Sequence, residues 1–176
     1  ANMAAGPLFW TPTIEGLYNF PYAVKNHEFI DSDAWHEGLT PEIIADIKQS
    51  LAHPERIGYF QQTPQRWPTL KRKFQQLREN GVVLLVGTDS GIPMKFHSGS
   101  TWNELDVWVN QLGVPAIDAI RGATYWPAVA MKVDRDYGSV TKNKYADIIA
   151  VKGDVLKQVA LLQRVDIVVK HGKQVK

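Results

Sequence analysis

Apolar residues gather in two short runs that predict buried strands. Residues 82–86, VVLLV, are all apolar. A strand of this kind has both faces buried, as in parallel strands that are covered by helices. A second short strand is predicted over residues 8–14, LFWTPTI, where Pro12 interrupts the run. The pattern therefore predicts strands that lie inside a layered α/β fold.

Elsewhere in the chain, apolar residues recur with the period of a helix. Thr40 and Pro41 are a typical cap and first helical residue. Asn80-Gly81 is typical of a left-handed helix end, and residues 101–104, TWNE, have the form of a capping box. Helices are predicted over residues 40–51, 68–80, 101–112, 115–123 and 127–131.

Two segments lack the helical period. Residues 15–39 are aromatic-rich and aperiodic, which predicts a long functional loop or lid. From about residue 133 the chain becomes strand-rich, with turn signals such as Asn143. We therefore expect an α/β part over residues 1–132, with a lid-like insertion at about 15–60, and a β module over 133–176.

Charge and cysteine content exclude several classes of protein. The 176 residues carry a net charge of +2 without a basic block, so nucleic acid is not an expected partner. The apolar runs are shorter than the roughly 20 residues of a membrane helix, so no membrane is expected. The absence of Cys excludes disulfides and thiolate sites. Cytoplasm and periplasm both remain open as the compartment.

The strand over residues 82–86 leads directly to a carboxylate, Asp89. Ligands of α/β proteins bind at the carboxyl ends of parallel strands. Gly87 and Gly91 on either side permit a sharp turn and a close approach of backbone. From these residues alone, Asp89 is either a functional carboxylate or the cap of a turn.

The second half of the chain carries five motifs in a fixed order: GTDSGIP, TWNELDVWV, VPAIDAIRGATYWPA, DYGSVTKNKYADIIAVKGD and VDIVVKHGKQVK. This order resembles the C-terminal part of the amidohydrolase superfamily, in its imidazolonepropionase and Xaa-Pro dipeptidase-like branch. The match spans residues 81–176 and extends more weakly to WTPT at 10–13. Asn143 and Val155 depart from the family's usual Gly and Pro. The resemblance implies strands seven and eight of a TIM-like (β/α)₈ barrel, plus part of a small β-sandwich.

The resemblance also assigns roles to residues. It makes Asp89 a metal ligand and the proton shuttle of the reaction. His97, Ser90 and Thr88 are candidates for substrate contact, although the two hydroxyls can equally satisfy the turn and His97 can be a solvated loop residue. His27 and His36 lie in the long aperiodic segment and are candidates to line a lid.

A metal site needs more ligands than this sequence offers. A catalytic zinc takes about three protein ligands, whereas the five His include no H-x-H pair. The chain is therefore expected to be the C-terminal segment of a metal-dependent amidohydrolase that hydrolyses C–N bonds of an amide, cyclic amide or dipeptide-like small molecule. We expect a divalent metal, zinc as one or two ions, only in the complete enzyme. A missing N-terminal barrel segment or a partner chain would supply the other ligands, and we expect an oligomer. The isolated chain is expected to be inactive.

Two alternatives stay open at this stage. The chain is either a catalytic segment or a truncated, non-catalytic remnant that serves assembly. Asp89-Ser90-Gly91 also has the D-S-G form of an aspartic protease, which pairs two such carboxylates. That second alternative requires a nearly all-β fold.

Overall fold

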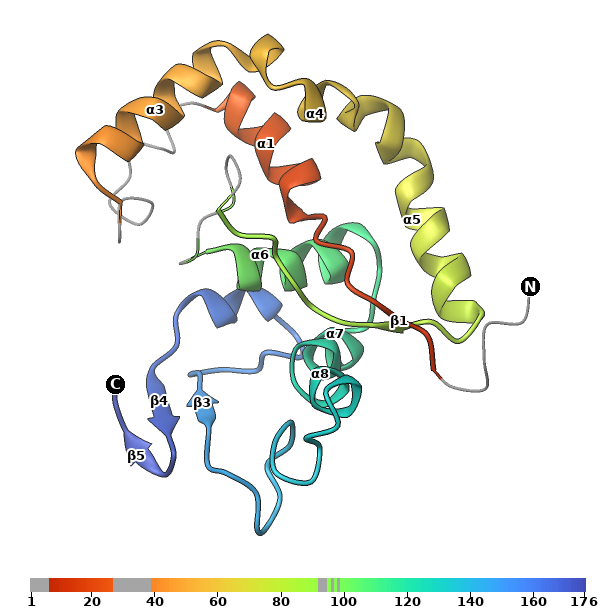
Figure 1. Ribbon diagram of the computed structural model, residues 1–176, viewed down its shortest axis with the longest axis vertical. Helices are drawn as coiled ribbons and strands as arrows, with labels where there is room; N and C mark the ends of the chain where they lie inside the picture. Colours follow the sequence, from red (N-terminus) through yellow and green to blue (C-terminus); the bar gives the residue numbers. More distant parts are fainter. Residues whose placement is uncertain (1–6, 27–38, 92–94, 96, 98) are drawn as a thin grey trace.

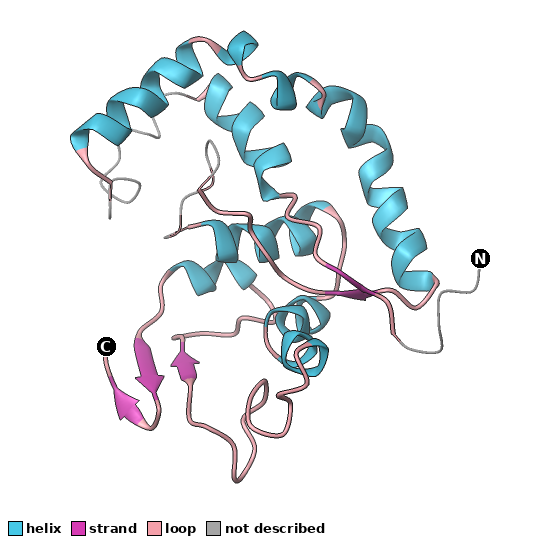
Figure 2. Ribbon diagram, in the orientation of Figure 1, coloured by secondary structure: helices cyan, strands magenta, loops and turns pink. Residues whose placement is uncertain are grey.

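The computed structural model describes residues 7–26, 39–91, 95, 97 and 99–176. Helices make up most of this part, and the strands form one parallel pair and one three-stranded antiparallel sheet (Figure 2). The fold is thus mixed α/β, as predicted. Because helices flank the D-S-G segment on both sides in the described part, the aspartic-protease alternative is wrong.

The two predicted buried strands pair with each other. β1 (Phe9–Trp10) lies parallel to β2 (Val83–Leu84), with Phe9 opposite Val83. The Leu85 amide donates to the Trp10 carbonyl at 2.9 Å, so the ladder continues beyond β2. The parallel arrangement inferred from the continuous apolar run is confirmed, and it points both strand ends in one direction.

Residues 15–25 correct the prediction of a loop. They form a helix, α1 (Glu15–Lys25), which buries Leu17, Phe20 and Ala23. Pro21 lies inside this helix. Because proline normally ends or kinks a helix, its presence argued against a helix in the sequence. The predicted lid is a prediction still, since residues 27–38 lie outside the described part of the chain.

The helices between residues 41 and 79 arch over α1 (Figure 1). α3 (Pro41–Ala52) begins as predicted, because the Thr40 hydroxyl accepts a hydrogen bond from the Ile43 amide at 3.4 Å. η2 (Pro54–Arg56) and α4 (Gly58–Gln61) follow. α5 (Thr63–Glu79) starts five residues earlier than predicted, with Pro68 inside it. Gly81 has a φ of 76°, which confirms the predicted left-handed helix end.

The main core lies between the parallel strands and the helices that follow them. α6 (Ser100–Asp106) continues into a π-helical turn, η3 (Val107–Gln111), and α7 (Ala116–Ala123) and α8 (Tyr125–Ala130) come next. Phe74 and Trp108 are fully buried, with ring centroids 5.8 Å apart. The Val86 amide donates to the Gly122 carbonyl at 2.8 Å, so α7 packs directly behind β2. This packing fixes where the chain leaves β2.

The C-terminal residues form the antiparallel sheet. β3 (Ile148–Ala150), β4 (Ile167–Lys170) and β5 (Lys173–Gln174) lie in the order β3-β4-β5. η4 (Val159–Gln163) packs against α6 and joins this sheet to the rest of the chain. Asn143 has a φ of 73°, as predicted for a tight turn. Among the described residues no helix is long and apolar enough to cross a membrane.

Candidate active site

Asp89 lies beyond the end of β2, three residues after Val86, and it is exposed. Its φ of 54° is left-handed, a conformation that Asp tolerates better than most residues. A Cβ on Gly87 would stand 2.3 Å from Thr11 Cγ2, and Gly91 has a φ of 103°. Both glycines are therefore required by the close approach and the sharp turn, as the sequence predicted.

Two of the other predicted site residues, Thr88 and Ser90, flank Asp89 in the turn. The Thr88 and Ser90 hydroxyls are 2.7 Å apart and hydrogen-bond to each other across Asp89. His97 is exposed, and its Cε1 would be 3.9 Å from a Cβ on Gly91. The structure thus brings these residues together at the end of β2. Their contact with substrate stays a prediction.

The described residues do not form a complete metal site. Within them, no three His, Asp or Glu side chains converge in a way that could hold an ion. Asp89 fits as a single carboxylate donor, because it is exposed and makes no hydrogen bond or ion pair within the described part of the chain. His53 instead lies 3.3 Å from the Glu55 carboxylate at the surface. His27 and His36 lie outside the described residues.

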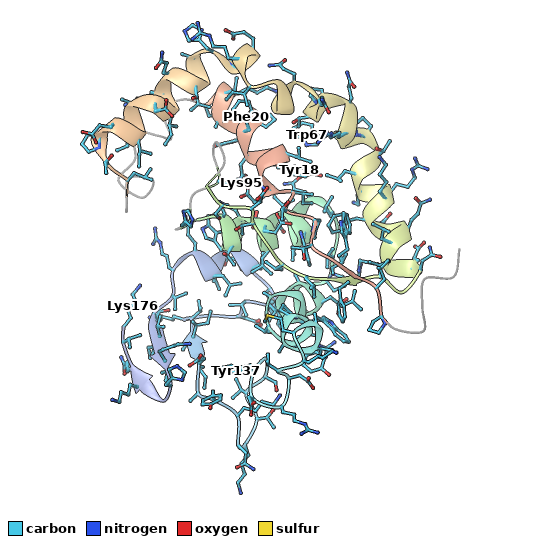
Figure 3. The ribbon with its side chains drawn as sticks, viewed as in Figure 1. Tyr18, Phe20, Trp67, Lys95, Tyr137 and Lys176 are labelled. Carbon is cyan, nitrogen blue, oxygen red and sulfur yellow. The ribbon has the colours of Figure 1, made fainter. Side chains whose placement is uncertain are left out.

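The sequence did not predict the buried charged cluster of Lys95, Glu15 and Glu104 beside the Asp89 turn. Lys95 is only 3% exposed, and Glu15 and Glu104 are fully buried. The Lys95 ammonium donates to the carbonyl oxygens of Thr13 at 2.6 Å and Thr88 at 2.9 Å. Figure 3 shows Lys95 beside the start of α1. One cation therefore joins the segments that leave the two parallel strands.

Glu104 corrects the predicted capping box. Among the described residues, no side chain caps the start of α6. Glu104 instead accepts hydrogen bonds from the amides of Ile14 at 3.1 Å and Glu15 at 2.7 Å, at the start of α1. Glu104 also accepts a hydrogen bond from the Trp108 indole N–H at 2.8 Å. A glutamate one turn before a buried Trp was the only signal of this role in the sequence.

Burial shifts the acids of this cluster. Desolvation raises the pKa of Glu15 from 4.5 to about 7, against the lowering effects of the Lys95 ammonium and of the Ser100 hydrogen bond. Desolvation also raises the pKa of Glu104, although the Ile14 amide and Trp108 hydrogen-bond to its carboxylate. A carboxyl group disfavours its charged form when it leaves water. The cluster therefore holds less negative charge near neutral pH than its residue types suggest.

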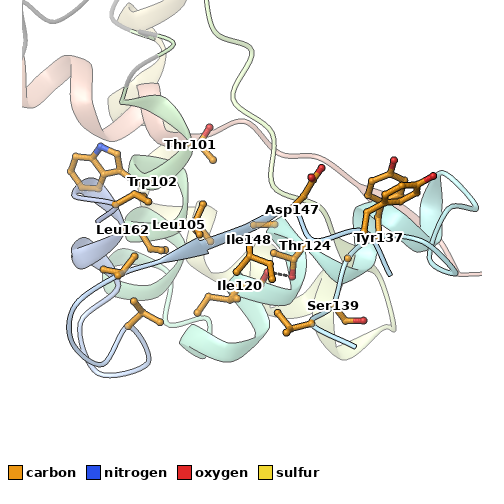
Figure 4. A pocket seen from close by; sticks show the side chains of 18 of the residues that line it. Thr101, Trp102, Leu105, Ile120, Thr124, Tyr137, Ser139, Asp147, Ile148 and Leu162 are labelled. Atoms are coloured by element: carbon orange, nitrogen blue, oxygen red, sulfur yellow. Dashed lines mark hydrogen bonds between the residues drawn. The ribbon is translucent and has the colours of Figure 1, made fainter. Parts of the chain in front are cut away.

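A cavity of about 820 Å³ lies between α6, α7 and the C-terminal sheet (Figure 4). Apolar side chains such as Leu105, Ile120 and Ile148 line it. His97 reaches its wall, whereas Asp89 does not line it. Asp147, which precedes β3, accepts a hydrogen bond from the His171 amide at 2.8 Å and pairs with Lys170, so its contacts are with the end of β4 and the turn that follows. The cavity thus includes His97 in its lining but not Asp89.

Known proteins resemble this chain over part of their length. A curated adenine deaminase from Rubrobacter xylanophilus is 30% identical over 128 residues, which cover 68% of this chain and 20% of that protein. A solved Xaa-Pro dipeptidase with methionine in its active site is 27% identical, with a TM-score of 0.58, over 96% of this chain and 34% of that one. Ochratoxinase from A. niger shares the fold, with 22% identity and a TM-score of 0.60, over 96% and 32%.

The chain spans about a fifth of that adenine deaminase and about a third of the two solved structures. The Amidohydrolase family matches residues 71–175, more than half of the chain. These residues include β2, the Asp89 turn and the C-terminal sheet, which are the segments whose motifs carried the resemblance. The chain belongs to the amidohydrolase family.

Proposed function

We propose that this chain supplies the proton-transferring carboxylate, Asp89, of a metal-dependent amidohydrolase that hydrolyses a C–N bond. One observation carries the assignment. Asp89 is an exposed carboxylate in the segment that follows the parallel strand β2, held in a left-handed turn and engaged by no other side chain of the described residues. The carboxyl ends of parallel strands are where α/β enzymes bind their ligands.

The relatives support the type of bond. An adenine deaminase and a Xaa-Pro dipeptidase are similar to this chain, and deamination and dipeptide cleavage both break a bond between carbon and nitrogen. We therefore propose an amide, cyclic amide or dipeptide-like small molecule as the substrate class.

Asp89 can perform both proton transfers of such a hydrolysis. One carboxylate oxygen of Asp89 takes a proton from the attacking water while the water oxygen forms a bond to the substrate carbon. The same carboxyl group then gives that proton to the leaving nitrogen, when the C–N bond breaks. A divalent ion, when bound, would lower the pKa of water in this site, and Asp89 is the described residue that offers it a ligand.

The complete site requires further polypeptide in this proposal. We propose that β1 and β2 are the seventh and eighth strands of a barrel, because within the described residues each has only one strand neighbour and unpaired edges favour further pairing. A preceding segment or a partner chain in an oligomer would bring the remaining ligands. Zinc is the proposed metal, because imidazole and carboxylate donors suit it.

The test compares Asp89→Asn with Asp46→Asn in the complete enzyme. Asp46 is an exposed residue of α3 and serves as the matched control for loss of one carboxylate. Asp89→Asn should lower turnover of an amide substrate by at least about 100-fold, since general acid–base catalysis contributes that much or more. Metal content by elemental mass spectrometry should fall as well. Turnover within tenfold of the control would contradict the assignment, and metal-free wild-type protein would favour the non-catalytic remnant.

A further inference from the structure

The two segments that leave the parallel strands are tied together by one buried cation. The Lys95 ammonium donates to the Thr13 carbonyl, beyond β1, and to the Thr88 carbonyl, beyond β2. With Lys95 only 3% exposed, these bonds are shielded from water. Hydrogen bonds from a charged donor are stronger than those between neutral groups. Lys95 therefore restrains the two segments strongly against each other.

Both segments hold a residue in the left-handed region at that point. Thr13 has a φ of 50° and Asp89 a φ of 54°. Such a conformation is unfavourable for a β-branched residue, and it persists only where surrounding contacts impose it. The Thr88 carbonyl belongs to the peptide group that precedes Asp89. Lys95 therefore fixes the orientation of the Thr88–Asp89 peptide group, which is the peptide group on the N-terminal side of Asp89.

Glu104 and Lys95 both hydrogen-bond to the backbone between β1 and α1. Glu104 accepts from the Ile14 amide, while Lys95 donates to the Thr13 carbonyl of the same peptide group. A Cβ on Gly16 would stand 2.7 Å from Lys95 Cε. The aliphatic stem of Lys95 thus runs against the backbone of α1, in a space that only glycine leaves open.

We propose that Lys95 is a positioning residue, which sets the direction of the Asp89 carboxylate by fixing the Thr88–Asp89 peptide group against α1. The inference rests on the proposed function of Asp89. Lys95 itself is buried and directs its ammonium at two backbone carbonyls. It acts through Asp89 and does not touch substrate.

The test uses the complete, metal-loaded enzyme with Lys95→Met. Lys73→Met is the matched control, because Lys73 is an exposed residue of α5. We expect kcat to fall at least tenfold with KM within twofold, and the affinity for zinc, measured by chelator competition, to fall severalfold. The visible spectrum of the cobalt-substituted protein should also change, which a loss of stability alone would not produce.

A second variant keeps the inference testable if Lys95→Met does not fold. Gly16→Ala leaves the lysine in place but puts a methyl group 2.7 Å from its Cε, while alanine favours the helix. We expect the same changes in kcat and cobalt spectrum, at smaller size. Wild-type kcat and spectrum in Gly16→Ala, or values for Lys95→Met that equal those of Lys73→Met, would overturn the inference.

Asp89→Asn, measured in parallel, separates the two proposals. If Asp89→Asn loses turnover and metal while Lys95→Met behaves as Lys73→Met does, only the positioning role fails. If Asp89→Asn keeps wild-type turnover and metal affinity, the proposed function fails and the positioning role with it.

Discussion

Replacing Glu104 with Gln tests whether a side chain of α6 holds the start of α1. The carboxylate accepts three hydrogen bonds: from the Ile14 amide and the Trp108 indole on one oxygen, and from the Glu15 amide on the other. Gln has the same shape but only one acceptor oxygen. In its better orientation the amide NH₂ faces the Glu15 N–H, so one buried donor loses its partner.

The expected cost combines opposing terms. An unsatisfied buried N–H costs about 1–3 kcal/mol of stability. The two remaining hydrogen bonds would be made to a neutral acceptor, which roughly halves their strength. Against this, Gln removes a carboxylate whose burial is unfavourable, as its raised pKa indicates. We therefore expect the free energy of unfolding to fall by about 2 kcal/mol, near the centre of the range for a lost buried partner.

Urea and thermal unfolding, followed by tryptophan fluorescence and circular dichroism, measure this change. A loss of about 2 kcal/mol lowers Tm by roughly 4–8 °C for a chain of this size. Glu79→Gln, at the exposed end of α5, is the control, expected within about 0.5 kcal/mol of wild type. A Glu104→Gln protein as stable as this control, or more stable than wild type, would refute the reasoning. It would mean that desolvation of the carboxylate outweighs its three bonds.

The remaining predictions concern pH and packing. The pKa of Glu15 is raised from 4.5 to about 7, so its contribution to stability is present below about pH 4.5 and is lost as pH rises towards 7, by at most about 3 kcal/mol. Glu15→Gln should flatten that decline in urea unfolding between pH 4.5 and 7, though Glu104 adds a slope of the same sign; an unchanged slope would contradict the shift. Gly87→Ala should cost about 1–3 kcal/mol through overpacking, because its Cβ would lie 2.3 Å from Thr11 Cγ2. Gly58→Ala, with open space around it, is the control, and equal stability of the two variants would count against the clash.

Local sequence patterns predicted the parts of the fold whose causes are local. The continuous apolar run at 82–86 predicted a parallel strand, which β2 confirms. Thr40 predicted its own capping bond, three residues along. Gly81 predicted a left-handed helix end. For the helix cap and the helix end, the signal and its effect lie within a few residues of each other, so they depend little on the rest of the chain. The partner of β2, in contrast, is β1, which is far away in the sequence.

The candidate site divides in the same way. The sequence by itself placed Asp89 after an apolar strand, between two glycines that the turn requires. Only the tertiary structure decided that α1 is a helix and that Lys95 and Glu104 lie beneath the turn. The partners in those contacts are 82 and 90 residues apart. Burial and charge at such distances depend on which elements pack together, and no local pattern specifies that.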